Sequence, residues 1–252
     1  MKLEVHATSD VGYVRSHNED MALVGHRFVR DDSLNAYHEV GPDGRPYLLA
    51  VADGLGGHSA GEVASREVLE SLRGEVADLE ANLTPATVTQ RLTEIAGRIQ
   101  NDLTRRGASS PGRQGMSTTL TSVLIYEDQF FLLHAGDSRC YVLRNGMLRQ
   151  VTRDHTLREF SGDPSIPGNI LVNCFGIHEE FFTDTQQFGT EGEPGDVFLI
   201  CSDGLTDMVS DERIEQTLRE AESMERAGDF LLEQAQEGGA ADNITFVLAR
   251  IL

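Results

Sequence analysis

The chain has 252 residues, of which 39% are hydrophobic and 25% charged, a composition that excludes disordered and fibrous proteins and is typical of a soluble globular one. Its 41 acidic and 21 basic residues give a formal net charge of −20, which argues against a nucleic-acid partner because such partners select basic surfaces. No apolar run approaches the roughly 20 residues of a membrane span, and the N-terminus lacks a signal-peptide pattern. We therefore expect one cytoplasmic domain over residues 1–252, with no membrane contact.

The first part of the chain predicts a strand, a turn and an adjacent acidic pair. A strand pattern begins at residue 3 and turns near Gly12, and Glu19 and Asp20 precede the apolar residues 21–24. In an extended chain neighbouring side chains point to opposite faces, so only one of these two acids can reach a given site. The polar residues 25–47 then predict a long hairpin loop.

A short apolar run ends abruptly at Asp53, and three of the next four residues are glycine. The run predicts a strand buried on both faces, with Asp53 at its open end. Glycine has no Cβ and tolerates positive φ, so this turn allows a ligand to approach the backbone closely. An ordinary strand-to-loop turn has the same local pattern, and Asp53 alone does not decide between the two.

The rest of the chain alternates between helical and strand periodicity. Apolar residues at intervals of three and four predict helices over residues 61–79 and from Pro85 onward, with Thr84 as N-cap, and a loop over 105–117. Apolar runs joined by tight turns predict antiparallel strands at 118–126, 130–135, 139–144 and 147–151. Residues 152–176 look irregular. A strand at 196–202, two helices at 211–221 and 224–236, and a last strand at 244–251 complete the pattern, with Ser210 as a helix cap.

The three cysteines are widely spaced and contain no CxxC pair, so they predict neither disulfides nor a thiolate zinc site. A cysteine phosphatase needs an arginine six residues after its nucleophile. Gly146, Glu180 and Asp207 occupy those positions, and this enzyme class is excluded.

Carboxylates recur at strand ends. Asp53 and Asp203 each follow an apolar strand, Asp137 lies in a turn, and Asp242 precedes the final strand. In an antiparallel sheet one strand ends where its neighbour begins, so these residues can meet at one rim, with Glu19 or Asp20 beside them. A set of oxygen ligands suits Mg²⁺ or Mn²⁺, and two such ions can drive hydrolysis of a phosphate ester. Each aspartate taken alone has the alternative of a turn or cap residue.

These motifs, in this order, resemble the metal-dependent protein serine/threonine phosphatases, the PPM or type 2C family, in their compact bacterial form. The motifs that carry the resemblance are Arg15 with Glu19-Asp20, Asp53-Gly54 with Gly56-Gly57, Gly115 to Thr119, Gly136-Asp137-Ser138-Arg139, Asp154-His155, Cys201-Ser202-Asp203-Gly204 and Asp242-Asn243. The resemblance implies an α+β fold, a four-layer α-β-β-α sandwich in which helices flank two antiparallel sheets.

The resemblance also implies the ligands of two metal ions. Asp53 matches the residue that bridges both ions, and the Gly54 carbonyl matches a ligand of the first. Asp203 and Asp242 match ligands of the second ion, which Glu19 supports directly or through water. Asp53, Asp203 and Asp242 are accordingly the expected catalytic carboxylates.

Two further positions match the family pattern. Asp137 corresponds to a ligand of a third, weaker ion, shared with Asp203. Arg15 corresponds to the residue that clamps the substrate phosphate and acts in catalysis, a task suited to the planar guanidinium. The alternative for Arg15 is a salt bridge to the local acids.

The chain departs from the family pattern at two places. Eukaryotic members have a histidine after the Asp-Gly pair, proposed as the general acid, where this chain has Leu55; His58 lies three residues on and is expected to stabilise a turn. The general acid therefore stays unassigned. Residues 156–175 match a flap that is usually longer, and Leu171, Val172 and Asn173 stand where relatives have a different run. This change leaves substrate preference open.

The resulting hypothesis is a Mn²⁺- or Mg²⁺-dependent phosphatase that removes phosphate from serine or threonine of proteins. Its expected partners are phosphorylated proteins, including a bacterial Ser/Thr kinase and the substrates of that kinase, and it is expected to be a monomer. An inactive family member that binds phosphoproteins is one alternative. A phosphodiesterase or nuclease on the same metals is another, which the acidic composition disfavours.

Overall fold

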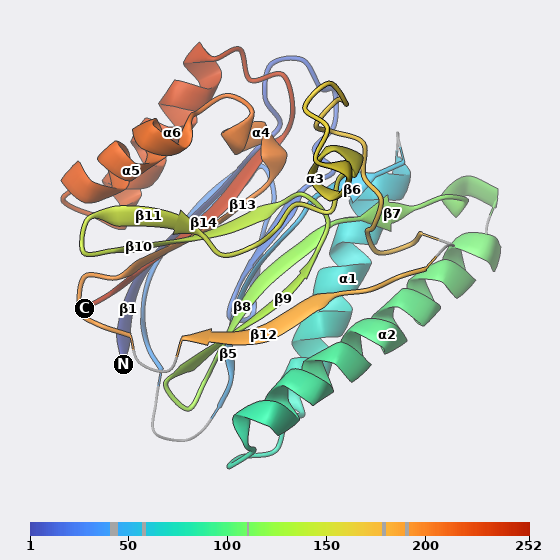
Figure 1. The fold of residues 1–252 in the computed structure, drawn as a ribbon, viewed down its shortest axis with the longest axis horizontal. Coiled ribbons are helices and arrows are strands. Elements are labelled where there is room, and N and C mark those ends of the chain that lie inside the picture. The colour runs from blue at the N-terminus through green and yellow to red at the C-terminus, as the bar shows by residue number, and fades with distance from the viewer. Residues whose placement is uncertain (41–44, 57–58, 110, 178–179, 190–191) are drawn as a thin grey trace.

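The computed structural model describes residues 1–252 except 41–44, 57–58, 110, 178–179 and 190–191. Two six-stranded antiparallel sheets pack face to face between layers of helices (Figure 1). The first sheet contains, in spatial order, β11 (Met147–Gln150), β10 (Arg139–Arg144), β13 (Val197–Cys201), β14 (Ile244–Ile251), β1 (Lys2–Asp10) and β4 (Asp32–Glu39). The second contains β12 (Asp184–Gly189), β9 (Gln129–Ala135), β8 (Leu120–Tyr126), β5 (Tyr47–Ala52), β2 (Met21–Val24) and β3 (Arg27–Val29).

The helices cover the outer faces of both sheets (Figure 1). Beside the second sheet lie α1 (Ser59–Ala77) and α2 (Pro85–Ser109), and beside the first lie α4 (Asp203–Thr206), α5 (Asp211–Glu220) and α6 (Met224–Glu237). Short elements complete the fold: η1 (Pro111–Arg113), α3 (Leu157–Ser161) and the paired strands β6 (Gly54–Leu55) and β7 (Ser117–Thr118). The predicted four-layer α-β-β-α sandwich is therefore confirmed.

Three apolar clusters correspond to the three interfaces between these layers. One joins α1 and α2 to the second sheet, one fills the space between the sheets, and one joins the first sheet to α4, α5 and α6. Strand β5 shows why the layers form: Leu48 and Ala50 belong to the helix-side cluster, whereas Leu49 and Val51 belong to the cluster between the sheets. The prediction of a strand buried on both faces is confirmed.

The predicted helices and strands are present with bounds close to those expected, except that α2 continues to Ser109, into the loop predicted over residues 105–117. Thr84 caps α2, since its Oγ1 accepts from the Thr87 N–H at 3.2 Å. Ser210 stands at the N-cap position of α5 but its side chain makes no capping hydrogen bond, so that part of the prediction is wrong. All three cysteines are free and buried.

The long loop predicted over residues 25–47 is wrong, because β3 and β4 lie within it. Strand β4 is an edge strand whose side chains, except that of Leu34, are exposed or half-buried. Its backbone pairs with β1 over eight residue positions from Lys2–Glu39 to Ser9–Asp32. Such a strand is held by backbone hydrogen bonds and carries no hydrophobic periodicity that a sequence pattern could reveal.

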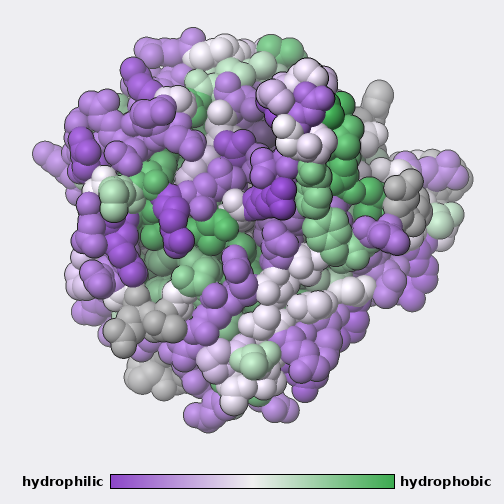
Figure 2. All heavy atoms as spheres, in the orientation of Figure 1, coloured by the Kyte–Doolittle hydropathy of each residue, from purple (hydrophilic) through white to green (hydrophobic). Residues whose placement is uncertain are grey.

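The open side of the sandwich between the edge strands β11 and β12 is hollowed. Figure 2 shows apolar residues in a recess there, framed by hydrophilic ones. The recess has a volume of about 300 Å³, and Phe130, Phe188 and Phe198 line it. Among the helices of the described ranges, none is long and apolar enough to cross a membrane.

Candidate active site

The candidate site lies at the end of the sandwich where β6, α3 and α4 meet (Figure 1). Asp53 follows β5, Asp203 opens α4 with one residue between it and the end of β13, and Asp242 precedes β14. A pocket of about 250 Å³ lies between these strand ends. Its lining contains Arg15, Ser16, His17, Glu19, Asp53, Gly54, Leu55, Gly56, Asp203, Asp242 and Asn243.

Asp53 is held in place by the strand β7 and the residue that follows it. Its backbone N–H donates to Thr119 Oγ1 at 3.0 Å, and its carbonyl accepts from the Thr119 N–H at 2.8 Å and the Thr118 hydroxyl at 2.7 Å. Gly54 lies so close to α1 that a Cβ there would overlap the carbonyl oxygens of Gly61 and Glu19. Only glycine fits at this position, which explains the Asp-Gly pair after the strand.

Asn243 ties the loop before β2 to the start of β14. Its Oδ1 accepts from the Glu19 N–H at 2.9 Å, and its Nδ2 donates to the carbonyls of Val11 at 2.9 Å and His17 at 3.0 Å. This loop carries Arg15, whose guanidinium donates to Asp242 Oδ2 at 2.7 Å. The salt-bridge alternative for Arg15 is thus present in the structure, and the role of Arg15 toward phosphate stays a prediction.

The two acidic side chains before β2 lie in different surroundings, as predicted for neighbours in an extended chain. Glu19 lines the pocket, whereas Asp20 is 1% exposed and accepts from the Ser202 hydroxyl at 2.7 Å. Burial raises the pKa of Asp53, and the Asp20 carboxylate is the charged neighbour that raises it most. Asp20 therefore belongs to the electrostatic environment of the site. The sequence predicted Asp20 only as an alternative to Glu19, because neighbouring side chains in an extended chain point to opposite faces and only one of the two can face the site.

The carboxylates of this region are poorly compatible with one another in the absence of a cation. Burial and neighbouring carboxylates raise the pKa values of Asp20, Asp53 and Asp203, and they raise the pKa of Asp137 to about 7. Asp203 Oδ1 is also buried without a hydrogen-bond partner. A buried, unsatisfied oxygen among acids that resist ionisation is what a bound divalent cation would satisfy.

The pocket offers the kind of ligand atoms that a metal ion needs, but its side chains do not form a complete coordination shell. In the described part of the chain, no three His, Cys, Asp or Glu side chains form a ready-made ligand group. One Asp242 oxygen faces the Arg15 guanidinium instead. Gly54 lines the same pocket, and its backbone carbonyl offers a further oxygen. The residues at this pocket are thus a hard oxygen set without thiolates, which suits Mg²⁺ or Mn²⁺.

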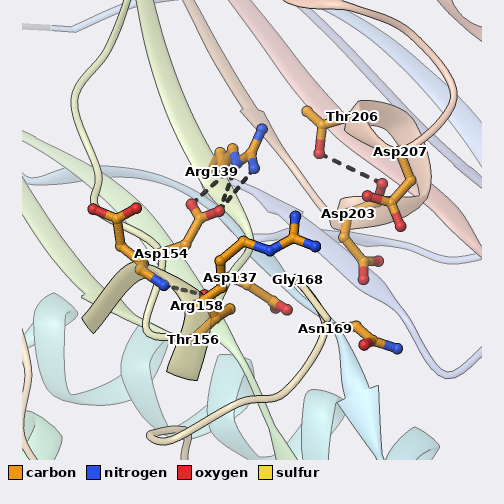
Figure 3. A pocket seen from close by; sticks show the side chains of 11 residues that line it. Asp137, Arg139, Asp154, Thr156, Arg158, Gly168, Asn169, Asp203, Thr206 and Asp207 are labelled. Carbon is orange, nitrogen blue, oxygen red and sulfur yellow. Dashed lines mark hydrogen bonds and ion pairs between the residues drawn. The ribbon is translucent and has the colours of Figure 1, made fainter. Parts of the chain in front are cut away.

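Asp137 lies in a second pocket, of about 380 Å³, which shares Asp203 with the first. Figure 3 shows Arg139 held by Asp154 on one wall and Asp203, Thr206 and Asp207 on another. The guanidinium of Arg139 donates to both oxygens of Asp154, at distances from 2.7 to 3.1 Å. This ion pair joins the turn that carries Asp137 and Arg139 to the Asp154-His155 segment.

The predicted flap segment forms part of the wall of the second pocket. The pocket is lined by Thr156, Arg158, Glu159, Gly168 and Asn169 from the predicted flap segment. This segment is less irregular than predicted, because α3 lies within it, Thr156 caps that helix, and Thr156 forms a β-bridge with Leu171. Leu55 lines the first pocket, whereas His58 lies outside the described residues.

Two helix layers, two antiparallel sheets and an acid-lined pocket at one end are the arrangement expected of the metal-dependent protein phosphatases. The chain belongs to the protein phosphatase 2C family, whose model matches residues 28–248.

Individual relatives agree with this assignment. Over 256 residues the chain is 35% identical to the serine/threonine protein phosphatase PstP of Mycobacterium tuberculosis. The aligned region covers 98% of this chain but 44% of PstP, so the chain spans less than half of that relative. It is 31% identical over 250 residues to the serine/threonine phosphatase stp of Listeria monocytogenes, with 95% of this chain and 92% of stp covered. The crystal structure of the catalytic domain of PstP with two manganese ions matches with a TM-score of 0.76 at 34% identity, covering 98% of both chains.

Proposed function

We propose that residues 1–252 form one phosphatase domain that hydrolyses phosphoserine and phosphothreonine in proteins with the help of two Mn²⁺ or Mg²⁺ ions. The observation that carries the proposal is the meeting of Asp53, Asp203 and Asp242 at one pocket beside Arg15, with a buried Asp203 oxygen left unpaired. When bound, a pair of such ions activates water and neutralises negative charge during phosphoryl transfer.

The residues of the pocket divide this task. Asp53, fixed at its backbone by Thr118 and Thr119, would hold both ions, with the Gly54 carbonyl on the first. Asp203 and Asp242 would hold the second, and Glu19 would support it.

The remaining predicted residues act around this pair. Asp137 and Asp203 would hold a third, weaker ion between the two pockets. The planar fork of Arg15 would hold two oxygens of the phosphate, and it is kept at the pocket by Asp242 until substrate arrives.

We also propose the setting in which the enzyme works. Phosphoserine and phosphothreonine in proteins are products of kinases, so the enzyme would oppose a bacterial Ser/Thr kinase. Three free, buried cysteines fit a reducing compartment such as the cytoplasm. The net charge of −20 disfavours self-association and polyanion binding, in keeping with a monomer that does not bind nucleic acid.

The decisive experiment measures hydrolysis of an aryl phosphate and of a phosphothreonine peptide with Mn²⁺, with Mg²⁺ and with excess chelator. Turnover should require a metal and should fall by on the order of 100-fold or more in Asp53→Asn, because one bridging oxygen is lost. Asp229→Asn, at an exposed position of α6, is the matched control and should behave as the wild type. Turnover that persists in chelator contradicts the metal mechanism. No turnover with either metal favours the inactive phosphoprotein-binding module.

A further inference from the structure

The loop that carries Arg15 also presents two exposed apolar side chains. Tyr13 is 66% exposed and Val14 is 71% exposed, and they directly precede Arg15. Single exposed apolar residues are ordinary on protein surfaces. This pair differs because it directly precedes Arg15, the residue proposed to hold the phosphate, and Arg15 lines the pocket.

The loop is anchored to the segment that bears Asp242. The Tyr13 N–H donates to the Ala240 carbonyl at 2.9 Å, and the Gly12 N–H donates to Asp10 Oδ1 at 2.8 Å. Gly12 has a φ of +74°, and a Cβ there would overlap the Asp242 carbonyl oxygen, so the backbone of the loop lies directly against that segment.

The other end of the loop is fixed as well. Asn243 donates to the carbonyls of Val11 and His17, one before and one after the exposed pair. The pair is therefore held by hydrogen bonds on both sides. Exposed apolar groups on an ordered backbone bind a partner with little loss of backbone entropy.

We infer that Tyr13 and Val14 form an apolar docking surface for a substrate side chain close in sequence to the phosphorylated residue. The inference rests on the proposed function and adds a sequence preference to it. Consecutive Cα atoms are about 3.8 Å apart and an extended peptide advances by about 3.3 Å per residue, so substrate residues roughly two to four positions from the phosphorylated one can reach the pair.

The surface selects by desolvation. A leucine or phenylalanine placed on Tyr13 and Val14 removes apolar area from water on both partners, whereas a serine there removes little. The phosphate stays with Arg15 in either case. The pair therefore changes the relative rate on different substrates rather than the reaction itself.

The test uses the whole chain with Mn²⁺ and two phosphothreonine peptide libraries, in which positions −4 to +4 carry either leucine or serine one at a time. For the wild type, kcat/KM at one or more of positions two to four should favour leucine by about 10-fold, the effect of a small apolar contact. In Tyr13→Ser/Val14→Ser the preference should fall to about 1. Tyr13→Phe/Val14→Ile, which keeps the apolar surface, should retain it.

Tyr37→Ser is the matched control, since Tyr37 is 77% exposed on β4, and the leucine preference should persist in it. Turnover without any leucine preference in the wild type overturns the inference alone, as does a preference that survives in Tyr13→Ser/Val14→Ser. A wild-type dimer that this double variant dissociates, seen by analytical ultracentrifugation, assigns the pair to a second copy and also overturns it. A wild type inactive on aryl phosphate and peptides overturns the proposed function, and the inference with it.

Discussion

Arg15 is the residue at which the geometry and the proposed chemistry are most directly linked. It is the only basic side chain of Lys or Arg type that lines the 250 Å³ pocket in the described part of the chain, and it faces a carboxylate rather than a phosphate. An exposed ion pair of this kind contributes little to stability. Its value lies in keeping the guanidinium at the pocket.

Removing the guanidinium is expected to weaken phosphate binding. We expect Arg15→Ala to lower kcat/KM on an aryl phosphate by roughly 10- to 100-fold, the loss of charge-assisted hydrogen bonds, and Arg15→Lys to lie between Arg15→Ala and the wild type. Arg226→Ala, which removes an exposed arginine of α6, should leave kcat/KM unchanged. An unaltered kcat/KM in Arg15→Ala would mean that Arg15 serves only its ion pair.

His134 connects the second sheet to the segment before the flap. The ring is fully buried, with Nε2 3.0 Å from the Arg153 carbonyl and Nδ1 2.9 Å from the Thr121 hydroxyl. Because a carbonyl only accepts a hydrogen bond, Nε2 carries a proton, and the Thr121 hydroxyl donates its own proton to the Ser138 carbonyl at 2.9 Å. Burial, and after it the nearby His155 ring, lowers the pKa of His134 to about 3.

This shift predicts a loss of stability in acid. The unfolded chain binds a proton at His134 below about pH 6.5 whereas the folded chain does not until about pH 3, so stability decreases as pH falls through this window. The contribution is about 1.4 kcal/mol per pH unit below pH 6.5. Urea unfolding at pH 7, 6 and 5 should show His134→Gln losing its stability difference from the wild type as pH falls. If the free energies of unfolding of His134→Gln and the wild type changed in parallel with pH, the pKa of His134 would not be lowered by folding.

At the scale of elements, the flap is short but well anchored. Asn173 is completely buried and its Nδ2 lies 2.8 Å from His155 Nδ1 and donates to the Phe182 carbonyl at 2.9 Å. His155 in turn accepts from the Gly136 N–H at 3.2 Å, beside the turn that carries Asp137. One buried amide thus joins the base of the flap to the second pocket.

Deleting this amide should destabilise the protein. Asn173→Ala leaves the Phe182 carbonyl and N–H without their partner, and we expect the free energy of unfolding to fall by about 2 kcal/mol. Asn101→Ala, on the exposed face of α2, should change it by less than about 0.5 kcal/mol. Denaturant unfolding of the two variants compares them directly, and equal effects would remove the anchoring role from Asn173.

At the scale of the whole molecule, strands distant in the chain deliver the acids of the site. Strands β5 and β13 belong to different sheets, so Asp53 and Asp203 meet only when the two sheets pack. The buried carboxylates that result oppose one another, and cations bound there would stabilise the packed sandwich as well as the reaction.

Metal binding is therefore expected to raise thermal stability. At a free Mn²⁺ concentration 100 times the dissociation constant, each ion adds about 2.7 kcal/mol, or roughly 5–10 °C in Tm for a chain of this size. Differential scanning calorimetry with Mn²⁺ and with chelator measures the shift, and Asp203→Asn should reduce it. A Tm that ignores Mn²⁺ would contradict metal binding by the folded state.

Local patterns in the sequence predicted the elements whose side chains are buried in a regular way. The stripes of α1 and α2, the buried run of β5 and the hairpin between β10 and β11 all place apolar residues at the period of their own geometry. The family resemblance similarly used short motifs at turns, where glycine and aspartate have few alternatives.

What only the tertiary structure decided depends on contacts between distant segments. Strand β4 exists through its backbone pairing with β1, the buried Asp20 accepts a hydrogen bond from Ser202, and the flap lines the Asp137 pocket rather than the Arg15 pocket. The sequence by itself determined the helices, most of the strands and the acids at strand ends, since periodicity and turn chemistry are local, whereas the layers were implied only by the family resemblance. The residues that contact those acids could be identified only from the packing of the two sheets, because contacts between distant segments produce no periodic pattern in the sequence.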